Sequence, residues 1–294
     1  MSPDLLSVAL RAAALVCLFQ AVGTTLFLAL FGSVLDASRL PIARIGRLAA
    51  LIAAPLLLAH AAIEAARMAG DYAGLADAGL QRLGWYSPDG AAQAMQVAGA
   101  LCMAAGLRDS NATGSRARFC QLLALVGVLL ALLPFLLTGH TSVHPLRAWL
   151  APLLAVHVLI IAFWFGALAP LYIVVVRESV EVAARTLRAF SAYATWLVPL
   201  ILVAGVALAC MLVPGITVLR QPYGELLLVK LAIFALLMCL AALNRSRLVP
   251  ALSLPQRRES AARLLRWSLV AEIGLLCAVL SVTAVLTTFF SPQH

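Results

Sequence analysis

The side chains best suited to chemistry in this sequence are histidines. His60 and His157 lie inside long apolar segments, each about ten residues from a segment end, and His140 and His144 lie between two such segments. Imidazole is the commonest side-chain ligand for metals and suits copper, zinc, nickel and iron. The pattern predicts a metal entrance at His140 and His144, followed by a transit pair at His60 and His157.

Each of these interpretations has a plainer alternative, and the sequence leaves both open. His140 and His144 could be a solvated loop pair, and His60 or His157 could be hydrogen-bonded to a neighbouring helix. The similar depth of His60 and His157 within their segments favours a shared role in metal transit.

Glu64, Met68 and Met95 extend the set of candidate metal ligands. Glu64 is one helical turn from His60 on the same face, so it could orient the imidazole, bind metal itself, or pair with Arg67. Thioether sulfur favours Cu(I), although methionines more often fill gaps between packed helices.

The composition shows which elements must position these side chains. Of 294 residues, 64% are hydrophobic and 11% are charged, and the mean hydropathy is +1.02. A soluble domain is roughly 45–50% apolar and about 25% charged. This contrast excludes a water-soluble, disordered or coiled-coil protein, and it argues against nucleic acid as the partner of the net charge of +9.

Charged residues divide the chain into segments long enough to cross a membrane. A bilayer core requires roughly 20 apolar residues per helix. We therefore predict an all-α, polytopic membrane helix bundle with about eight transmembrane helices, or seven if the short third segment fails, over residues 12–35, 48–70, 90–107, 119–138, 148–176, 189–214, 224–244 and 267–290.

The basic residues predict the orientation of this bundle. Fifteen of the 21 lysines and arginines fall in the loops after the first, third, fifth and seventh segments, and the opposite loops hold one each. Such loops face the cytoplasm, so both termini and the loop 71–89 are expected outside. The first ten residues contain no basic residue, so we expect the first helix to be retained rather than cleaved.

Catalytic signatures are absent from the sequence. It contains no GxxxxGK[ST], HExxH, CxxC or CxxCH pattern, which excludes a P-loop ATPase, a zincin, a thiol relay and covalent haem attachment. No enzymatic activity is predicted.

The C-terminal half resembles the CopD (PcoD) family of copper-resistance proteins of the bacterial inner membrane. The resemblance covers roughly residues 120–290 and departs from the family pattern at Ala167 and Ala204. It is carried by Thr138-Gly-His-Thr followed by His157, Trp164-Phe-Gly-Ala-Leu168, Phe190-Ser191, Tyr223-Gly-Glu-Leu-Leu-Leu-Val-Lys230, Asn244-Arg245, Leu248-Val-Pro250 and Leu265-Arg-Trp-Ser-Leu-Val-Ala-Glu272.

This resemblance implies a function that the residues alone do not select. It implies copper movement across the inner membrane, inward, with a periplasmic CopC-type partner and with His140 and His157 as metal residues. It implies unspecified roles for Lys230 and Glu272, which fall near opposite membrane faces and are not expected to pair; Lys230 could instead pair with Glu64. It also divides the chain into N-terminal helices at 1–115 and a CopD-like domain at 116–294.

Two other functions remain open at this point. His60 and His157 on different helices could be axial ligands of a haem, or the protein could hold metal for a partner without transporting it. The oxidation state of the copper, Cu⁺ or Cu²⁺, is not determined by the sequence.

Overall fold

The computed structural model describes residues 2–108, 114–138, 145–212 and 221–289. Within these ranges the regular secondary structure consists of helices joined by short turns. The helices are α1 (Pro3–Phe31), η1 (Gly32–Val34), α2 (Arg39–Ala69), η2 (Tyr72–Ala76), α3 (Ala78–Trp85), α4 (Pro88–Gly106), α5 (Gly114–Leu132), α6 (Pro134–Leu137), α8 (Arg147–Arg177), α9 (Val180–Leu212), α10 (Pro222–Leu243), η4 (Asn244–Leu248), α11 (Val249–Ala251) and α12 (Arg258–Phe289).

The predicted membrane helix bundle is confirmed, with one qualification. Each of the eight predicted segments is a helix, and seven are long and apolar enough to cross a membrane. The exception is α4, the short third segment, which is rich in alanine and glycine. Its Gly99 packs against the backbone of α5 at Gly127, so α4 contributes close packing rather than a strongly apolar surface.

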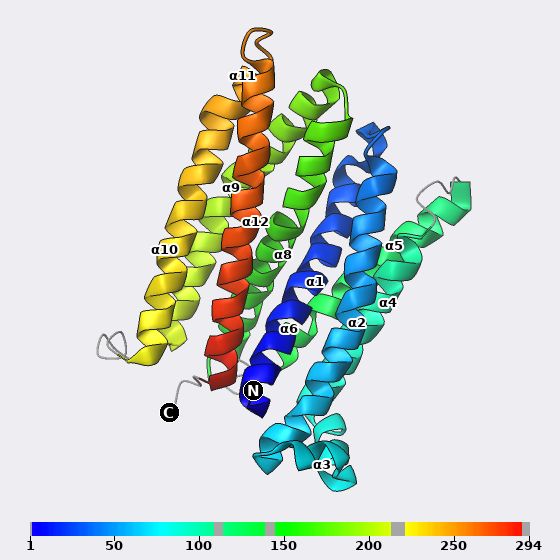
Figure 1. Ribbon diagram of the computed structural model, residues 1–294, viewed down its shortest axis with the longest axis vertical. Coiled ribbons are helices and arrows are strands. Elements are labelled where there is room, and N and C mark those ends of the chain that lie inside the picture. Colours follow the sequence, from blue (N-terminus) through cyan, green and yellow to red (C-terminus); the bar gives the residue numbers. More distant parts are fainter. Residues whose placement is uncertain (1, 109–113, 139–144, 213–220, 290–294) are drawn as a thin grey trace.

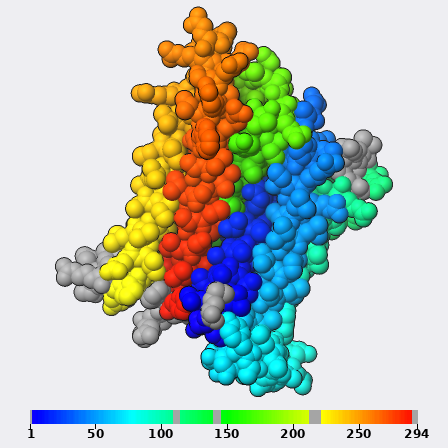
Figure 2. Space-filling view, in the orientation of Figure 1, coloured from blue at the N-terminus to red at the C-terminus, as the bar shows by residue number. Residues whose placement is uncertain are grey.

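The segment 71–89, expected to be a loop, is largely helical. It contains η2 and α3, whose first turns are capped by the side chains of Asp71 and Asp77. Short polar side chains that accept hydrogen bonds from free backbone N–H groups stabilise such helix starts. Figure 2 shows this part of the chain (cyan) projecting from one end of the molecule, opposite α11 and the start of α12 (orange).

The helices run so that the two ends of the bundle differ in charge. α1 begins and α12 ends near α3, whereas the basic residues between α1 and α2, between α8 and α9 and around α11 gather at the other end (Figure 1). We call these the outer end and the inner end, following the predicted orientation. The side of the membrane that each end faces stays a prediction.

Helix α1 lies at the centre of the bundle. It packs against α2, α8 and α12, with α4 and α5 beyond α2 and with α9 and α10 on the opposite side (Figure 1). At the crossing of α1 and α8, Gly23 meets Gly166, where an added Cβ would overlap backbone atoms. Gln20 Nε2 donates to the Gly166 carbonyl at 3.0 Å. Small residues and interhelical hydrogen bonds of this kind hold membrane helices together.

This core joins helices from both sides of residue 115. Buried residues of α1, α2, α4, α8 and α12 form one apolar cluster. The packed core therefore continues across residue 115. The division into domains at 1–115 and 116–294 stays a prediction.

Candidate functional sites

His60 is buried near the outer end of the bundle, between α2 and α4. It is 7% exposed, and its Nδ1 lies 3.1 Å from Nε2 of Gln93. The other ring nitrogen, Nε2, is 3.5 Å from Glu64 Oε1. Within the described residues this Nε2 has no hydrogen-bond partner, so it faces the carboxylate at a distance longer than a hydrogen bond.

Glu64 is held in place by a network that ties the start of α1 to the end of α2. Ser7 Oγ donates to its Oε1 at 2.8 Å, and Arg67 Nη1 donates to its Oε2 at 2.8 Å. Arg67 also donates from Nε to Asp4 Oδ1 at 2.9 Å. Glu64 therefore both pairs with Arg67 and faces His60, and the suggested pairing with Lys230 is wrong, because both carboxylate oxygens are engaged elsewhere.

Replacing Arg67 by alanine is expected to destabilise the fold. It removes two charge-assisted hydrogen bonds, to Glu64 and to Asp4, and at such partly exposed positions each contributes about 1 kcal/mol. Thermal unfolding of the purified protein in nanodiscs should show a lower midpoint. Arg82→Ala, on the exposed surface of α3, is the matched control, and an unchanged midpoint for Arg67→Ala would contradict the proposed role of the network.

The structure does not gather the predicted methionines around His60. Met68 lies two helical turns beyond His60, is 48% exposed, and has its terminal methyl group near Gly84 of α3. Met95 is two residues after Gln93 on α4, and at 3.6 residues per turn its side chain leaves the helix about 200° away. Their roles as sulfur ligands stay predictions.

His157 lies on the other side of α1, where α8 meets α9. Its ring packs over Gly205: a Cβ added to this glycine would lie 3.1 Å from His157 Cε1. The backbone of Ile201 and the ammonium of Lys230 are also close. In the part of the chain that the structure describes, the buried His157 Nδ1 has no hydrogen-bond partner.

His60 and His157 therefore belong to two separate sites. One contacts α4 and the other contacts α9, so the bis-histidine haem site has no support in this geometry. Among the described residues, no group of three His, Cys, Asp or Glu side chains is arranged to hold a metal ion. His140 and His144 lie outside the described residues.

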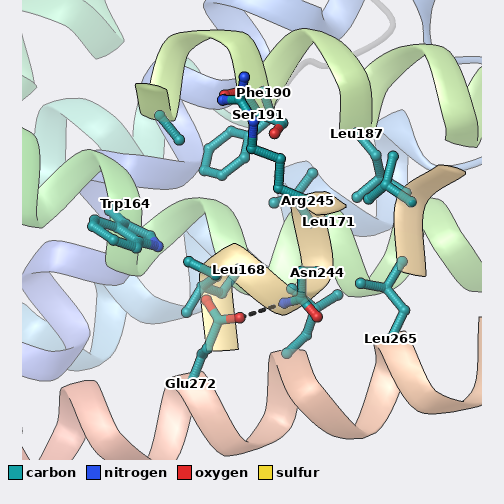
Figure 3. A pocket seen from close by; sticks show the side chains of 14 residues that line it. Trp164, Leu168, Leu171, Leu187, Phe190, Ser191, Asn244, Arg245, Leu265 and Glu272 are labelled. Atoms are coloured by element: carbon teal, nitrogen blue, oxygen red, sulfur yellow. Dashed lines mark hydrogen bonds between the residues drawn. The ribbon is translucent and has the colours of Figure 1, made fainter. Parts of the chain in front are cut away.

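A third site lies toward the inner end, and the sequence did not predict that its residues meet. Figure 3 shows a cavity between α8, α9, η4 and α12. Its lining includes Trp164, Phe190, Ser191, Asn244, Arg245 and Glu272. These residues come from four of the motifs noted in the sequence. Each of the four motifs contributes a side chain to the same cavity.

The buried acid Glu272 is the centre of this cavity. It is 2% exposed, and Asn244 Nδ2 donates to its Oε1 at 2.5 Å. Arg245 also lines the cavity and donates from Nη1 to the Ser191 carbonyl at 2.9 Å. Lys230 and Glu272 do not meet, as expected from their places along α10 and α12.

Comparisons with known proteins agree with this convergence of motifs. Residues 184–286 match the model of the family CopD, copper resistance protein D. Copper resistance protein D of Pseudomonas syringae pv. tomato is 35% identical over 182 residues, which span 58% of this chain and 58% of that protein. No solved structure matches the chain. The matched region carries Ser191, Asn244, Arg245 and Glu272, so over this stretch the multi-pass membrane protein is similar to the CopD family.

Proposed function

We propose that this protein carries copper ions across the bacterial inner membrane, from the histidine-bearing outer end to the arginine-rich inner end. The observation that carries the proposal is that His60 Nε2 and His157 Nδ1 are buried and unpartnered among the described residues. A buried polar atom without a partner costs about 1–3 kcal/mol. A metal ion bound at each of the two sites would satisfy its nitrogen, and copper is the metal named in the family description.

His60 has the surroundings of a metal ligand held by a second group. The Gln93 Oε1 atom is also buried and unpartnered within the described ranges. Rotating this amide by half a turn would let His60 Nδ1–H donate to Oε1, leaving the Nε2 lone pair free. A hydrogen bond on the second ring nitrogen is the usual partner of a metal-bound histidine. The Glu64 carboxylate, fixed by Ser7 and Arg67, then offers a negative charge beside the ion.

His157 fits a site of passage rather than of storage. The neighbouring Lys230 ammonium repels a cation bound to the ring, which keeps binding weak. Conduction requires sites that bind an ion well enough to admit it and weakly enough to release it. In this scheme His60 and His157 are separate binding sites, on either side of α1, for copper that moves from the outer end inward.

The remaining sequence predictions complete the scheme as proposals. His140 and His144 would capture copper at the outer face, Met68 and Met95 would assist as sulfur donors for Cu⁺, and a periplasmic CopC-type protein would deliver the ion. Since the sequence contains no ATPase motif, movement follows an existing gradient.

Transport by the purified protein tests this function. Proteoliposomes containing a trapped copper-sensitive dye are supplied with Cu⁺ or Cu²⁺ outside, with Zn²⁺ as the comparison metal. Copper is expected to enter faster than into protein-free liposomes, and faster than zinc. Copper that binds to the protein but enters no faster than into empty liposomes would contradict transport and favour a metal-holding assembly factor.

A further inference from the structure

We infer that Glu272 binds and releases a proton at the inner end of the bundle, and that this exchange is coupled to copper movement. The inference rests on the proposed function for its coupling to copper. The proton site itself stands on the geometry of the inner cavity.

Glu272 is a buried acid that has no counter-charge beside it among the described residues. Glu272 is 2% exposed, and its polar neighbours Asn244, Trp164 and Ser268 are all neutral. No ion pair to Glu272 exists among residues 2–108, 114–138, 145–212 and 221–289. Ionisable side chains inside membrane proteins are expensive unless they are paired, and they mark ion and proton pathways. With no cation beside it, a proton is the simplest species that can neutralise this carboxylate.

The polar neighbours of Glu272 can form hydrogen bonds with both its ionised and its protonated carboxyl group. As a carboxylate, Glu272 accepts from Asn244 Nδ2. As an acid it gains one O–H donor. Asn244 Oδ1 and Ser268 Oγ have no other hydrogen-bond partner among the described residues, and the Ser268 side chain is close enough to interact with Glu272. Both belong to residues beside Glu272, since Ser268 is one turn earlier on α12. The site therefore holds unused acceptors that a proton on Glu272 can satisfy.

The other charged and titratable groups around Glu272 are few. From η4 the cavity receives Arg245, whose guanidinium is engaged with the Ser191 carbonyl. The residues that α8 and α9 contribute to the lining are not titratable. The thiols Cys17 of α1 and Cys277 of α12 lie near each other, and Cys277 is more than one turn farther outward along α12 than Glu272. Lys230 of α10 lies near His157.

Two adjoining cavities connect Glu272 with the inner end of the bundle. The cavity leads from Glu272 past Asn244 to Arg245 and Ser191 (Figure 3). A second hollow shares Arg245 and Ser191 with the first and adds Arg188. Arg245 is exposed and belongs to the arginine-rich end. A proton leaving the Glu272 carboxyl group can therefore pass to water at the inner end without crossing the apolar core.

The backbone that carries Asn244 has an unusual form. Residues Asn244–Leu248 are a π-helix between α10 and α11. Such segments are rare and occur frequently at functional sites. Here the π-helix begins at the residue whose side chain meets Glu272, so this irregularity positions the amide beside the acid.

Infrared spectroscopy tests the proton site without copper. Metal-free protein in nanodiscs is titrated with acid and base, and the absorption of protonated carboxyl groups is recorded. Glu272→Gln is expected to remove one such band, and Glu272→Asp to keep it at a shifted frequency. Glu259→Gln, which changes an exposed acid of the same helix, should leave it unchanged. Persistence of the full set of bands in folded Glu272→Gln would overturn the inference.

Proton flux in proteoliposomes tests the coupling. With wild-type protein, copper entry is expected to drive protons in the opposite direction, and Glu272→Gln should reduce this flux roughly tenfold or more, the factor given by losing 1.4 kcal/mol of barrier lowering. Copper entry without proton flux in the wild type would overturn the coupling and leave transport standing. If the wild type moves no copper, the transport proposal and the coupling both fall, and the infrared band still decides the proton site.

Discussion

Replacing His157 by alanine is expected to reduce copper entry into proteoliposomes by roughly tenfold or more, while the protein still folds. Removing a partner behind a metal ligand typically costs 10–100-fold in affinity, and His157→Ala removes the ligand nitrogen itself. The ring packs over Gly205 at the boundary of α8 and α9, so its loss leaves a small space rather than an unpaired charge. The initial rate of copper entry, normalised to reconstituted protein, is the measurement.

Two further variants separate a role in transport from a role in packing. Gly205→Ala keeps the imidazole and places a methyl group against its edge, where the Cβ would lie 3.1 Å from Cε1, so an intermediate rate is expected. Leu159→Ala changes an exposed residue of the same helix and should leave the rate unchanged. A His157→Ala protein that transports copper at the wild-type rate would remove His157 from the pathway.

Replacing Gly23 by leucine is expected to have the largest effect on folding. A Cβ at this position would meet the Ala162 carbonyl oxygen and the Gly166 Cα. These are backbone atoms, so α1 and α8 must move apart. Overpacking of a core costs about 1–3 kcal/mol and occasionally more, and the separation also breaks the hydrogen bonds of Gln20 and Thr24 to the Gly166 carbonyl. The yield of monodisperse protein and its unfolding temperature should both fall sharply.

Gly274→Ala is the matched control for this substitution. A Cβ at Gly274 on α12 meets no atom within 4 Å, and alanine is favoured over glycine inside a helix by about 1 kcal/mol. The same measurements should show equal or slightly higher stability. Wild-type stability of Gly23→Leu would mean that the crossing of α1 and α8 does not have this close packing.

Prediction from sequence was most successful where the responsible forces are local. Runs of apolar residues must form helices in a membrane, because backbone groups can be satisfied only within the segment, so each of the eight segments was found as a helix. The loop 71–89 was misjudged because α3 depends on a cap at Asp77 rather than on an apolar run. The metal ligands were predicted from residue type, and His140 and His144 lie outside the described residues.

The contacts between residues of the inner cavity could not be predicted from the sequence. Trp164, Asn244 and Glu272 come from segments up to 108 positions apart in the sequence, and no periodicity within one helix indicates which face meets which neighbour. The same limit applies to His60 and His157. Their similar distances from segment ends suggested a shared site, yet α1 lies between α2 and α8 and separates them.

The sequence by itself determined the class of the protein, the presence of its main helices and the charge difference between its ends, because hydropathy and charge act along each segment. Several helices begin about nine residues before the predicted segments, since α1, α2, α9 and α12 extend beyond their apolar runs. Only the tertiary structure decided the partners of the polar side chains. Those partners depend on how helices cross, and the crossings depend on small residues such as Gly23 and Gly166 that let two backbones touch. The same packing that divides the histidines into separate sites brings Glu272 to Asn244 without a counter-charge.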